Sequence, residues 1–235
     1  MKYTLFVNKI VQWINRLGCF GATRFKIVKF IYDVFEDSNS RKGEWNFALK
    51  YLPDVRPAAW PLKKTIMPVL DVGSCESLFL YELDFRGYIT WGLDHKDYQE
   101  KLKKIPFFKV DISDPNLIKE DSHFFGYFYY IVAISTIEHV GLGAYGDPKR
   151  ENGDRLAMEN IYKLLREDGF VILTIPMRHW FSPTGRGYNM YQFKKLIEGL
   201  FDIFEITQTH GQLCAALYKT GMREITYLPK AGDII

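Results

Sequence analysis

The fold of this chain is indicated by the stretch VLDVGSCES at residues 69–77. It continues a short apolar run that begins at Ile66 and is typical of a buried strand, interrupted near its end by Asp71. Gly73 then opens a turn of small residues, and the apolar residues at 78–83 have the pattern of a helix. A strand, a small-residue turn and a helix form the first βα unit of nucleotide-type folds. In such folds a polar ligand binds beyond the strand, near the helix N-terminus.

Composition limits the class of protein. The chain has 235 residues, of which 47% are apolar, and its formal charge is +3. This length fits one α/β domain with additions or two small domains, and the charge is too small to indicate a nucleic-acid partner. The three cysteines are widely spaced, which argues against a disulfide framework or a structural zinc site and suits a reducing compartment. No apolar run approaches the roughly 20 residues that span a bilayer. Because the N-terminus also lacks the features of a secretory signal, we expect a cytoplasmic protein.

The N-terminal part of the chain differs from the rest. Residues 1–35 are predicted to form two amphipathic helices, with six basic residues before the first acid, Asp33. They form either a helical cap on the core, which we favour, or a surface that contacts an anionic membrane peripherally. Residues 37–43 are predicted to be a linker, and three prolines limit regular structure around residues 45–60. We therefore expect an N-terminal helical extension over residues 1–64 and a core domain over residues 65–235.

Within the core, apolar strand-like runs alternate with helical segments. Further strands are predicted at 87–94, 107–111, 127–135, 170–175, 201–207 and 213–219, and helices at 154–166 and 191–200. This alternation predicts a mostly parallel sheet covered on both faces. The last two strands are joined only around His210–Gly211, and so short a link makes them antiparallel. The expected fold is therefore α/β: a Rossmann-like three-layer sandwich, with a mostly parallel seven-stranded sheet and an antiparallel last strand.

The candidate ligand site follows from the carboxyl ends of the strands, where open α/β sheets bind their ligands. Asp94 lies 21 positions after Gly73, the spacing of an acid that accepts hydrogen bonds from both hydroxyls of a ribose. Asp111 suits an adenine, because its carboxylate can accept from the amino group while Ile112 covers the ring. The complete set of strand-end candidates is Asp71, Gly73, Ser74, Cys75, Asp94, His95, Asp111, Ile112 and Ser135.

These motifs resemble those of class I S-adenosylmethionine-dependent methyltransferases over about residues 65–219, roughly two-thirds of the chain. VLDVG at 69–73 resembles the first motif, GLD at 92–94 the ribose motif and VDI at 110–112 the adenine motif. LLREDGF at 164–170 resembles the turn into the fifth strand. The resemblance implies S-adenosylmethionine as the cofactor and methyl transfer as the activity. The first loop of this family usually carries two further glycines, and Cys75 and Ser77 stand in their places. A relative that binds the cofactor without turnover is therefore an alternative.

Other nucleotide sites are disfavoured. A dinucleotide dehydrogenase would carry glycines at positions 73, 75 and 78, and only Gly73 is present. The chain also contains no P-loop motif.

The stretch STIEHVGLGAYGD at residues 135–147 follows the fourth strand, where the methyl group should point. An alcohol acceptor needs a base, and a histidine base contributes on the order of 10²–10⁴-fold. We predict His139 as this base, with Glu138 or Asp147 orienting it or binding the acceptor. In this superfamily such a Glu-His pair can instead pack against the cofactor or cap a helix. A divalent metal at these three residues is an alternative that we do not favour. The stretch resembles quinone-pathway O-methyltransferases, but Ser135 replaces one of their acidic ligands.

The loop at residues 177–191 is aromatic and rich in hydrogen-bonding groups. Candidate substrate-binding residues in this loop and the preceding one are Tyr145, Arg178, His179, Trp180, Arg186, Tyr188 and Asn189. Such side chains suit a sugar, although they would also suit an exposed nucleobase, and the loop could simply close the end of the sheet. We predict an O-methyltransferase acting on a sugar hydroxyl of a glycan or glycolipid precursor. A lipid-like quinone or phenolic acceptor is the alternative.

Overall fold

The computed structural model describes residues 39–52, 67–77, 79–96, 105–178 and 181–221. Its helices are α3 (Asn39–Tyr51), α4 (Phe79–Phe85), α5 (Gly153–Leu164) and α6 (Met190–Ile197), with short 3₁₀ helices η1 (Ser74–Glu76) and η2 (Ile137–His139). The main sheet contains β1 (Pro68–Val72), β2 (Ile89–Asp94), β3 (Phe107–Lys109), β4 (Phe128–Ile134), β5 (Leu165–Pro176), β8 (Phe201–Thr209) and β9 (Gln212–Lys219). A separate hairpin consists of β6 (Phe181–Ser182) and β7 (Gly185–Arg186).

The main sheet has the strand order β3-β2-β1-β4-β5-β9-β8. The pairs from β3 to β5 are parallel, while β9 is antiparallel to both of its neighbours, β5 and β8. This is the seven-stranded sheet with an antiparallel last strand that the sequence predicts, and the prediction is confirmed. The strand order reverses between β1 and β4, so the carboxyl ends of these two strands form the place where a ligand is expected.

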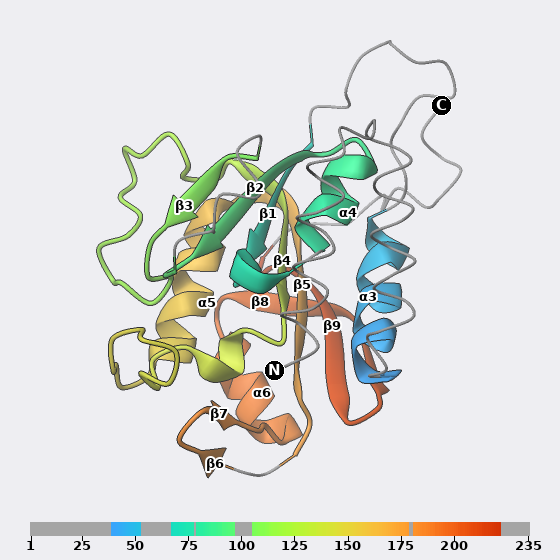
Figure 1. Cartoon of the computed structure of the whole chain (residues 1–235). Helices are drawn as coiled ribbons and strands as arrows, with labels where there is room; N and C mark the ends of the chain where they lie inside the picture. Colours follow the sequence, from blue (N-terminus) through green and yellow to red (C-terminus); the bar gives the residue numbers. More distant parts are fainter. Residues whose placement is uncertain (1–38, 53–66, 78, 97–104, 179–180, 222–235) are drawn as a thin grey trace, which may run out of the picture.

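Helices cover both faces of the sheet, with α3 and α4 on one side and α5 and α6 on the other (Figure 1). Along each strand, alternate side chains enter opposite cores, as the pleat of a strand requires. Leu70 and Val72 pack towards α5 and α6, whereas Val69 packs towards α3 and α4. The two apolar layers therefore fix the register of β1 and, with it, the position of the turn at its end.

Helix α3 corrects the prediction for residues 37–60. The polar residues at 37–43 indicated a linker, and the prolines further on indicated little regular structure, but residues 39–51 are helical. The helix forms because Phe47, Ala48 and Tyr51 recur at helical spacing and are buried against the sheet. Local polarity at the start of the helix concealed this spacing.

Other elements also differ from the prediction. Strand β3 ends at Lys109 rather than at residue 111, and α6 ends at Ile197 rather than at residue 200. Strand β5 begins at Leu165 rather than at residue 170, directly after α5, with a register shift opposite Phe128 and Tyr130. The β6–β7 hairpin lies inside the stretch that was predicted to be a loop. By contrast, His210 and Gly211 form the predicted tight link between β8 and β9, both with positive φ (46° and 81°), as two-residue hairpin turns require.

The predicted cap at residues 1–35, with its interpretation as a membrane-contacting surface, lies outside the described residues. None of the helices in the part of the chain that the structure describes is long and apolar enough to cross a membrane.

Candidate active site

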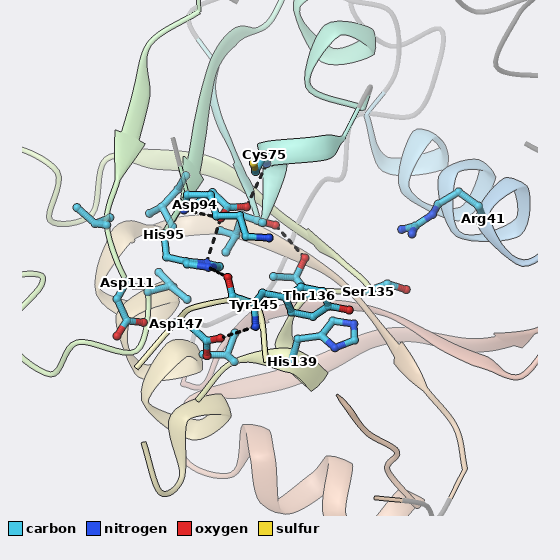
Figure 2. A pocket seen from close by; sticks show the side chains of 17 residues that line it. Arg41, Cys75, Asp94, His95, Asp111, Ser135, Thr136, His139, Tyr145 and Asp147 are labelled. Carbon is cyan, nitrogen blue, oxygen red and sulfur yellow. Dashed lines mark hydrogen bonds and ion pairs between the residues drawn. The ribbon is translucent and has the colours of Figure 1, made fainter. Parts of the chain in front are cut away.

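A cavity opens at the carboxyl ends of β1, β2 and β4, at the reversal of strand order (Figure 2). It is lined by Arg41, Val72, Gly73, Cys75, Leu93, Asp94, His95, Lys96, Val110, Asp111, Ile112, Ser135, Thr136, His139, Val140, Tyr145 and Asp147. Most of the strand-end candidates and two of the catalytic candidates thus share one cavity. Among the described residues, no cluster of three histidine, cysteine, aspartate or glutamate side chains could hold a metal ion.

The turn after β1 depends on one glycine. Gly73 has φ +78°, a conformation that side chains disfavour, and a Cβ atom there would lie 2.3 Å from the Thr136 hydroxyl. Cys75 and Ser77, which stand where glycines are usual, do not need a positive φ. Neither is among the described non-glycine residues with positive φ, and Ser77 has φ −83°. The absence of the other two glycines of the motif therefore puts no strain on the backbone of this turn.

Asp94, at the end of β2, is held by the turn. Its Oδ2 accepts a hydrogen bond from the Cys75 amide at 3.1 Å, and its Oδ1 accepts one from the Lys96 amide at 3.0 Å. The neighbouring His95 ring lies 3.1 Å from the same carboxylate through Nδ1, and its Nε2 donates to the Tyr145 carbonyl at 2.9 Å. This network orients the Asp94 carboxylate and ties the loop around Tyr145 to β2.

Asp111, which follows β3, also lines the cavity and is anchored by several contacts. Its Oδ1 accepts from the Ser113 amide and hydroxyl at 2.9 and 2.7 Å, and its Oδ2 lies 3.2 Å from the Arg150 guanidinium. The buried Asn160 amide donates to the Ile112 carbonyl at 2.7 Å, which fixes the backbone next to Asp111. Sequence reasoning missed Arg150 and Asn160, because their contacts lie about 40 to 50 positions from their partners.

Asp71 and Ser74 are buried and do not line the cavity. Burial, and then the nearby Asp94 carboxylate, raise the pKa of Asp71 to about 8. Its Oδ2 and the Ser74 hydroxyl have no hydrogen-bond partner among the described residues. Asp71 and Ser74 are therefore buried parts of the strand and turn that support the cavity, rather than residues that face a ligand.

Ser135 connects the sheet to α3. It has φ 46°, and its hydroxyl donates to Glu44 Oε2 at 2.9 Å, the oxygen that also accepts from the Thr174 hydroxyl at 3.1 Å. Arg41 lies one turn before Glu44 on α3, 3.7 Å from its carboxylate, and extends towards the cavity (Figure 2). Arg41 and Glu44 were not predicted, because residues 37–43 were interpreted as a linker and no helix was expected in the residues that follow.

His139 belongs to η2 and lines the cavity. Its Nδ1 is hydrogen-bonded to the Thr184 carbonyl, and its Nε2 lies 3.8 Å from Glu138 Oε1. Burial lowers the pKa of His139, so the neutral ring is favoured. Asp147 does not bond to His139. Its carboxylate accepts from three backbone amides of its own loop, at Gly141, Gly143 and Tyr145.

Glu138 is buried behind His139, and burial raises its pKa to about 8. Its Oε2 has no hydrogen-bond partner among the described residues. A carboxyl with this pKa is mostly protonated at neutral pH, so it can stand beside a neutral imidazole without an unpaired buried charge.

The substitution Glu138→Gln should stabilise the protein relative to wild type as the pH rises. In the unfolded chain this carboxyl ionises near pH 4.5, whereas in the folded protein it ionises near pH 8. The stability that the neutral carboxyl contributes is therefore complete below pH 4.5 and is lost as the pH rises towards 8. Glutamine stays neutral throughout. The difference in unfolding free energy should thus grow by at most about 1.4 kcal/mol per pH unit.

Denaturant unfolding of both proteins between pH 5 and 9 measures this difference. The control is Glu120→Gln, at an exposed position, which should show no such trend. Parallel pH profiles for wild type and Glu138→Gln would contradict a buried neutral carboxyl.

The residues predicted to bind substrate are only partly brought together. Tyr145 lines the cavity, and Arg178 is exposed beside Gly211. Tyr188 is buried, and its hydroxyl donates to Asp154 at 2.8 Å. Arg186 forms an ion pair with the same carboxylate at 2.7 Å. Asn189 caps α6 in a capping box with Gln192, while His179 and Trp180 lie outside the described residues.

Comparisons with known protein families give a limited match. A family model described as a Caenorhabditis protein of unknown function, DUF268, matches residues 92–205, just under half of the chain. The matched segment runs from β2 into β8 and includes Asp94, Asp111 and His139. No curated protein matches the chain.

Solved structures of similar fold are more informative. The PH0226 protein from Pyrococcus horikoshii OT3 has a TM-score of 0.58 at 14% identity, covering 80% of this chain and 98% of its own. A 1,6-didemethyltoxoflavin-N1-methyltransferase from Burkholderia thailandensis, solved with 1,6-didemethyltoxoflavin and S-adenosylhomocysteine, has a TM-score of 0.56 at 14% identity. It covers 80% of this chain and 81% of its own. The N-methyltransferase NodS from Bradyrhizobium japonicum WM9, in complex with S-adenosylhomocysteine, has a TM-score of 0.56 at 14% identity, with 79% and 90% covered. Identities this low establish a shared fold and nothing about the acceptor.

Proposed function

We propose that this chain, which has the fold of class I S-adenosylmethionine-dependent methyltransferases, transfers a methyl group from S-adenosylmethionine to a sugar hydroxyl. The observation that carries the proposal is the composition of one cavity. The carboxylates of Asp94 and Asp111 line one side of it, and His139, Ser135 and Arg41 lie on the other (Figure 2). A ligand with hydroxyl and amino donors at one end and a reactive group at the other suits this arrangement.

The side chains present fit the nucleoside part of the cofactor. Each carboxylate oxygen of Asp94 has two lone pairs, so Asp94 can hold the Cys75 and Lys96 amides and still accept from two ribose hydroxyls. Asp111 Oδ2, which accepts from Arg150, keeps one lone pair for the adenine amino group, and Ile112 offers an apolar contact to the ring. The bound cofactor supplies a methyl group that its sulfonium already activates.

Arg41 accounts for the amino-acid part of the same cofactor. Its cationic side chain lies on the side of the cavity away from Asp111 (Figure 2). Glu44, on the same helix, lies 3.7 Å from one guanidinium nitrogen, so the other N–H groups can bind a carboxylate. Gly73 also lines the cavity, and the Thr136 side chain packs against its backbone where a Cβ atom would otherwise stand.

The hydroxyl acceptor is supported by the neutral His139. A hydroxyl must lose its proton to become a good nucleophile, whereas a neutral amine needs little help. A cavity that holds a histidine with a lowered pKa therefore favours a hydroxyl. Two of the similar structures are N-methyltransferases, but their acceptors do not carry over at 14% identity.

A sugar is supported by exposed aromatic side chains, one in the cavity (Tyr145) and two in a second hollow beside α5 and the β6–β7 hairpin (Phe181 and Tyr191). Tyr145 is 46% exposed, Phe181 75% and Tyr191 70%. Flat apolar faces next to polar groups suit the apolar face and the hydroxyls of a sugar ring, and they supply the contact area that a small acceptor needs.

Two measurements test this proposal. Calorimetry should show binding of S-adenosylhomocysteine by the full chain, with an affinity that depends on Asp94. Methyl-labelled S-adenosylmethionine should then transfer label to the glycan or glycolipid fraction of a cell extract. Cofactor binding without transfer to any fraction would favour a non-catalytic relative. Label in a quinone or phenol fraction would replace the sugar, and absence of cofactor binding would reject the proposal.

A further inference from the structure

The β6–β7 hairpin is too small to hold its own shape. It contains two residue pairs, Phe181 with Arg186 and Ser182 with Gly185. The Ser182 hydroxyl accepts from the Thr184 amide and donates to the Gly185 carbonyl, which closes the turn. A two-stranded hairpin is at best marginally stable in water, so its position must be set by contacts with the rest of the chain.

The Arg186 side chain supplies two of those contacts. The Arg186 guanidinium lies 2.7 Å from Asp154 Oδ2 and donates to the Val140 carbonyl at 3.0 Å. Both partners of the pair are 16% exposed in their side chains, so water screens the pair only partly. Asp154 lies in the first turn of α5, where a carboxylate is favoured. The hairpin is thereby fastened both to α5 and to the residue that follows η2.

The same hairpin contacts the candidate base. The Thr184 carbonyl, at its tip, is hydrogen-bonded to His139 Nδ1. A carbonyl oxygen can only accept, so Nδ1 must carry a proton. The neutral imidazole has a single N–H, which leaves the lone pair on Nε2. The charged or titratable groups around the ring are Glu138, Tyr145, Asp147, Arg41 and Arg186, and the Tyr145 ring packs edge-on against the imidazole at 5.2 Å between centroids. The Glu138 carboxyl, at 3.8 Å from Nε2, is too far to donate to it.

We propose that Arg186 and Asp154 are positioning residues that, through the Thr184 carbonyl, hold His139 in the tautomer with a basic Nε2. This inference rests on the proposed function for its purpose, since Nε2 would then accept the proton of the acceptor hydroxyl. In this inference Arg186 affects the reaction by orienting His139 and does not contact the substrate.

The tautomer of His139 can be read directly by long-range proton–nitrogen NMR correlation on protein labelled with ¹⁵N at histidine. The His139 signal is assigned with His139→Gln. Above the pKa of this residue, the wild type should show a protonated Nδ1 and an unprotonated Nε2. In Arg186→Ala, both nitrogens should show intermediate shifts from mixed tautomers, and Arg186→Lys should restore the wild-type pattern in part.

Turnover of Arg186→Ala should fall at least about tenfold, because the base is misaligned, with affinity for S-adenosylhomocysteine unchanged.

Arg155→Ala is the matched control. Arg155 lies next to Asp154 in α5 and also forms an ion pair, with Glu159 at 3.1 Å, but its side chain bonds to carbonyls at the end of α6. It should leave the tautomer of His139 unchanged. A protonated Nε2 in the wild type, or an unchanged tautomer in Arg186→Ala, would overturn the inference. The NMR measurement of the tautomer does not depend on turnover. Full activity in His139→Gln would therefore reject His139 as the base, while the assignment of its tautomer would stand.

Discussion

Replacing His139 by glutamine is expected to reduce methyl transfer by about 10²–10⁴-fold, the range that a positioned general base contributes. Glutamine preserves much of the volume and can still bond to the Thr184 carbonyl, but it cannot accept the proton of a hydroxyl. The affinity for S-adenosylhomocysteine should be unchanged, because the ring lies across the cavity from Asp94 and Asp111 (Figure 2). Label transfer from S-adenosylmethionine and calorimetry measure the two quantities separately.

The pH dependence of the wild type provides a second sign of the base. Burial lowers the pKa of His139, so the neutral form persists to more acidic pH than for a free imidazole. Activity should therefore rise with pH on the acidic side of the usual histidine range and stay level up to about pH 8, where the neighbouring Glu138 ionises. His123→Gln, at an exposed position on the chain between β3 and β4, is the control and should keep the wild-type profile. Wild-type turnover in His139→Gln would show that the hydroxyl loses its proton elsewhere.

The strand-end residues could be predicted because they follow directly from local pattern. An apolar run followed by an acid places Asp94 and Asp111 at the carboxyl ends of β2 and just after β3, and parallel strands bring those ends to one edge. Whether the turn after β1 can form without glycines at positions 75 and 77 depends on its backbone angles, which the sequence does not give. Gly73 alone adopts positive φ in that turn.

The parts that could not be predicted depend on partners far away in the sequence. Glu44 lies 91 positions before Ser135, and no local spacing shows that the two bond. The aromatic and polar residues of the 177–191 loop illustrate the same limit. Tyr188 was predicted to face a substrate, yet its hydroxyl is bonded to Asp154 and the ring is buried. For Asn189 a local signal existed, since Asn189 and Gln192 have the spacing of a capping box.

Replacing Asp94 by alanine is expected to weaken binding of S-adenosylhomocysteine by about 10²-fold or more. Two hydrogen bonds from ribose hydroxyls to a carboxylate contribute about 1.5–3 kcal/mol each, and about 1.4 kcal/mol corresponds to a tenfold change in Kd. The variant also leaves the Cys75 amide without its acceptor, so the turn after β1 loses part of its support.

Asp94→Asn separates these two effects. It retains one oxygen that can accept from the Cys75 amide, but it loses the charge and one acceptor, so we expect a smaller loss of about tenfold. Asp114→Asn is the control, because Asp114 also caps a turn, accepting from the Asn116 amide at 2.9 Å, yet does not line the cavity. Calorimetric titration of the three variants should therefore give a graded series for position 94 and wild-type affinity for position 114. Equal affinities for wild type and Asp94→Ala would mean that the ribose lies elsewhere, and the cofactor pose built on this carboxylate would have to be abandoned.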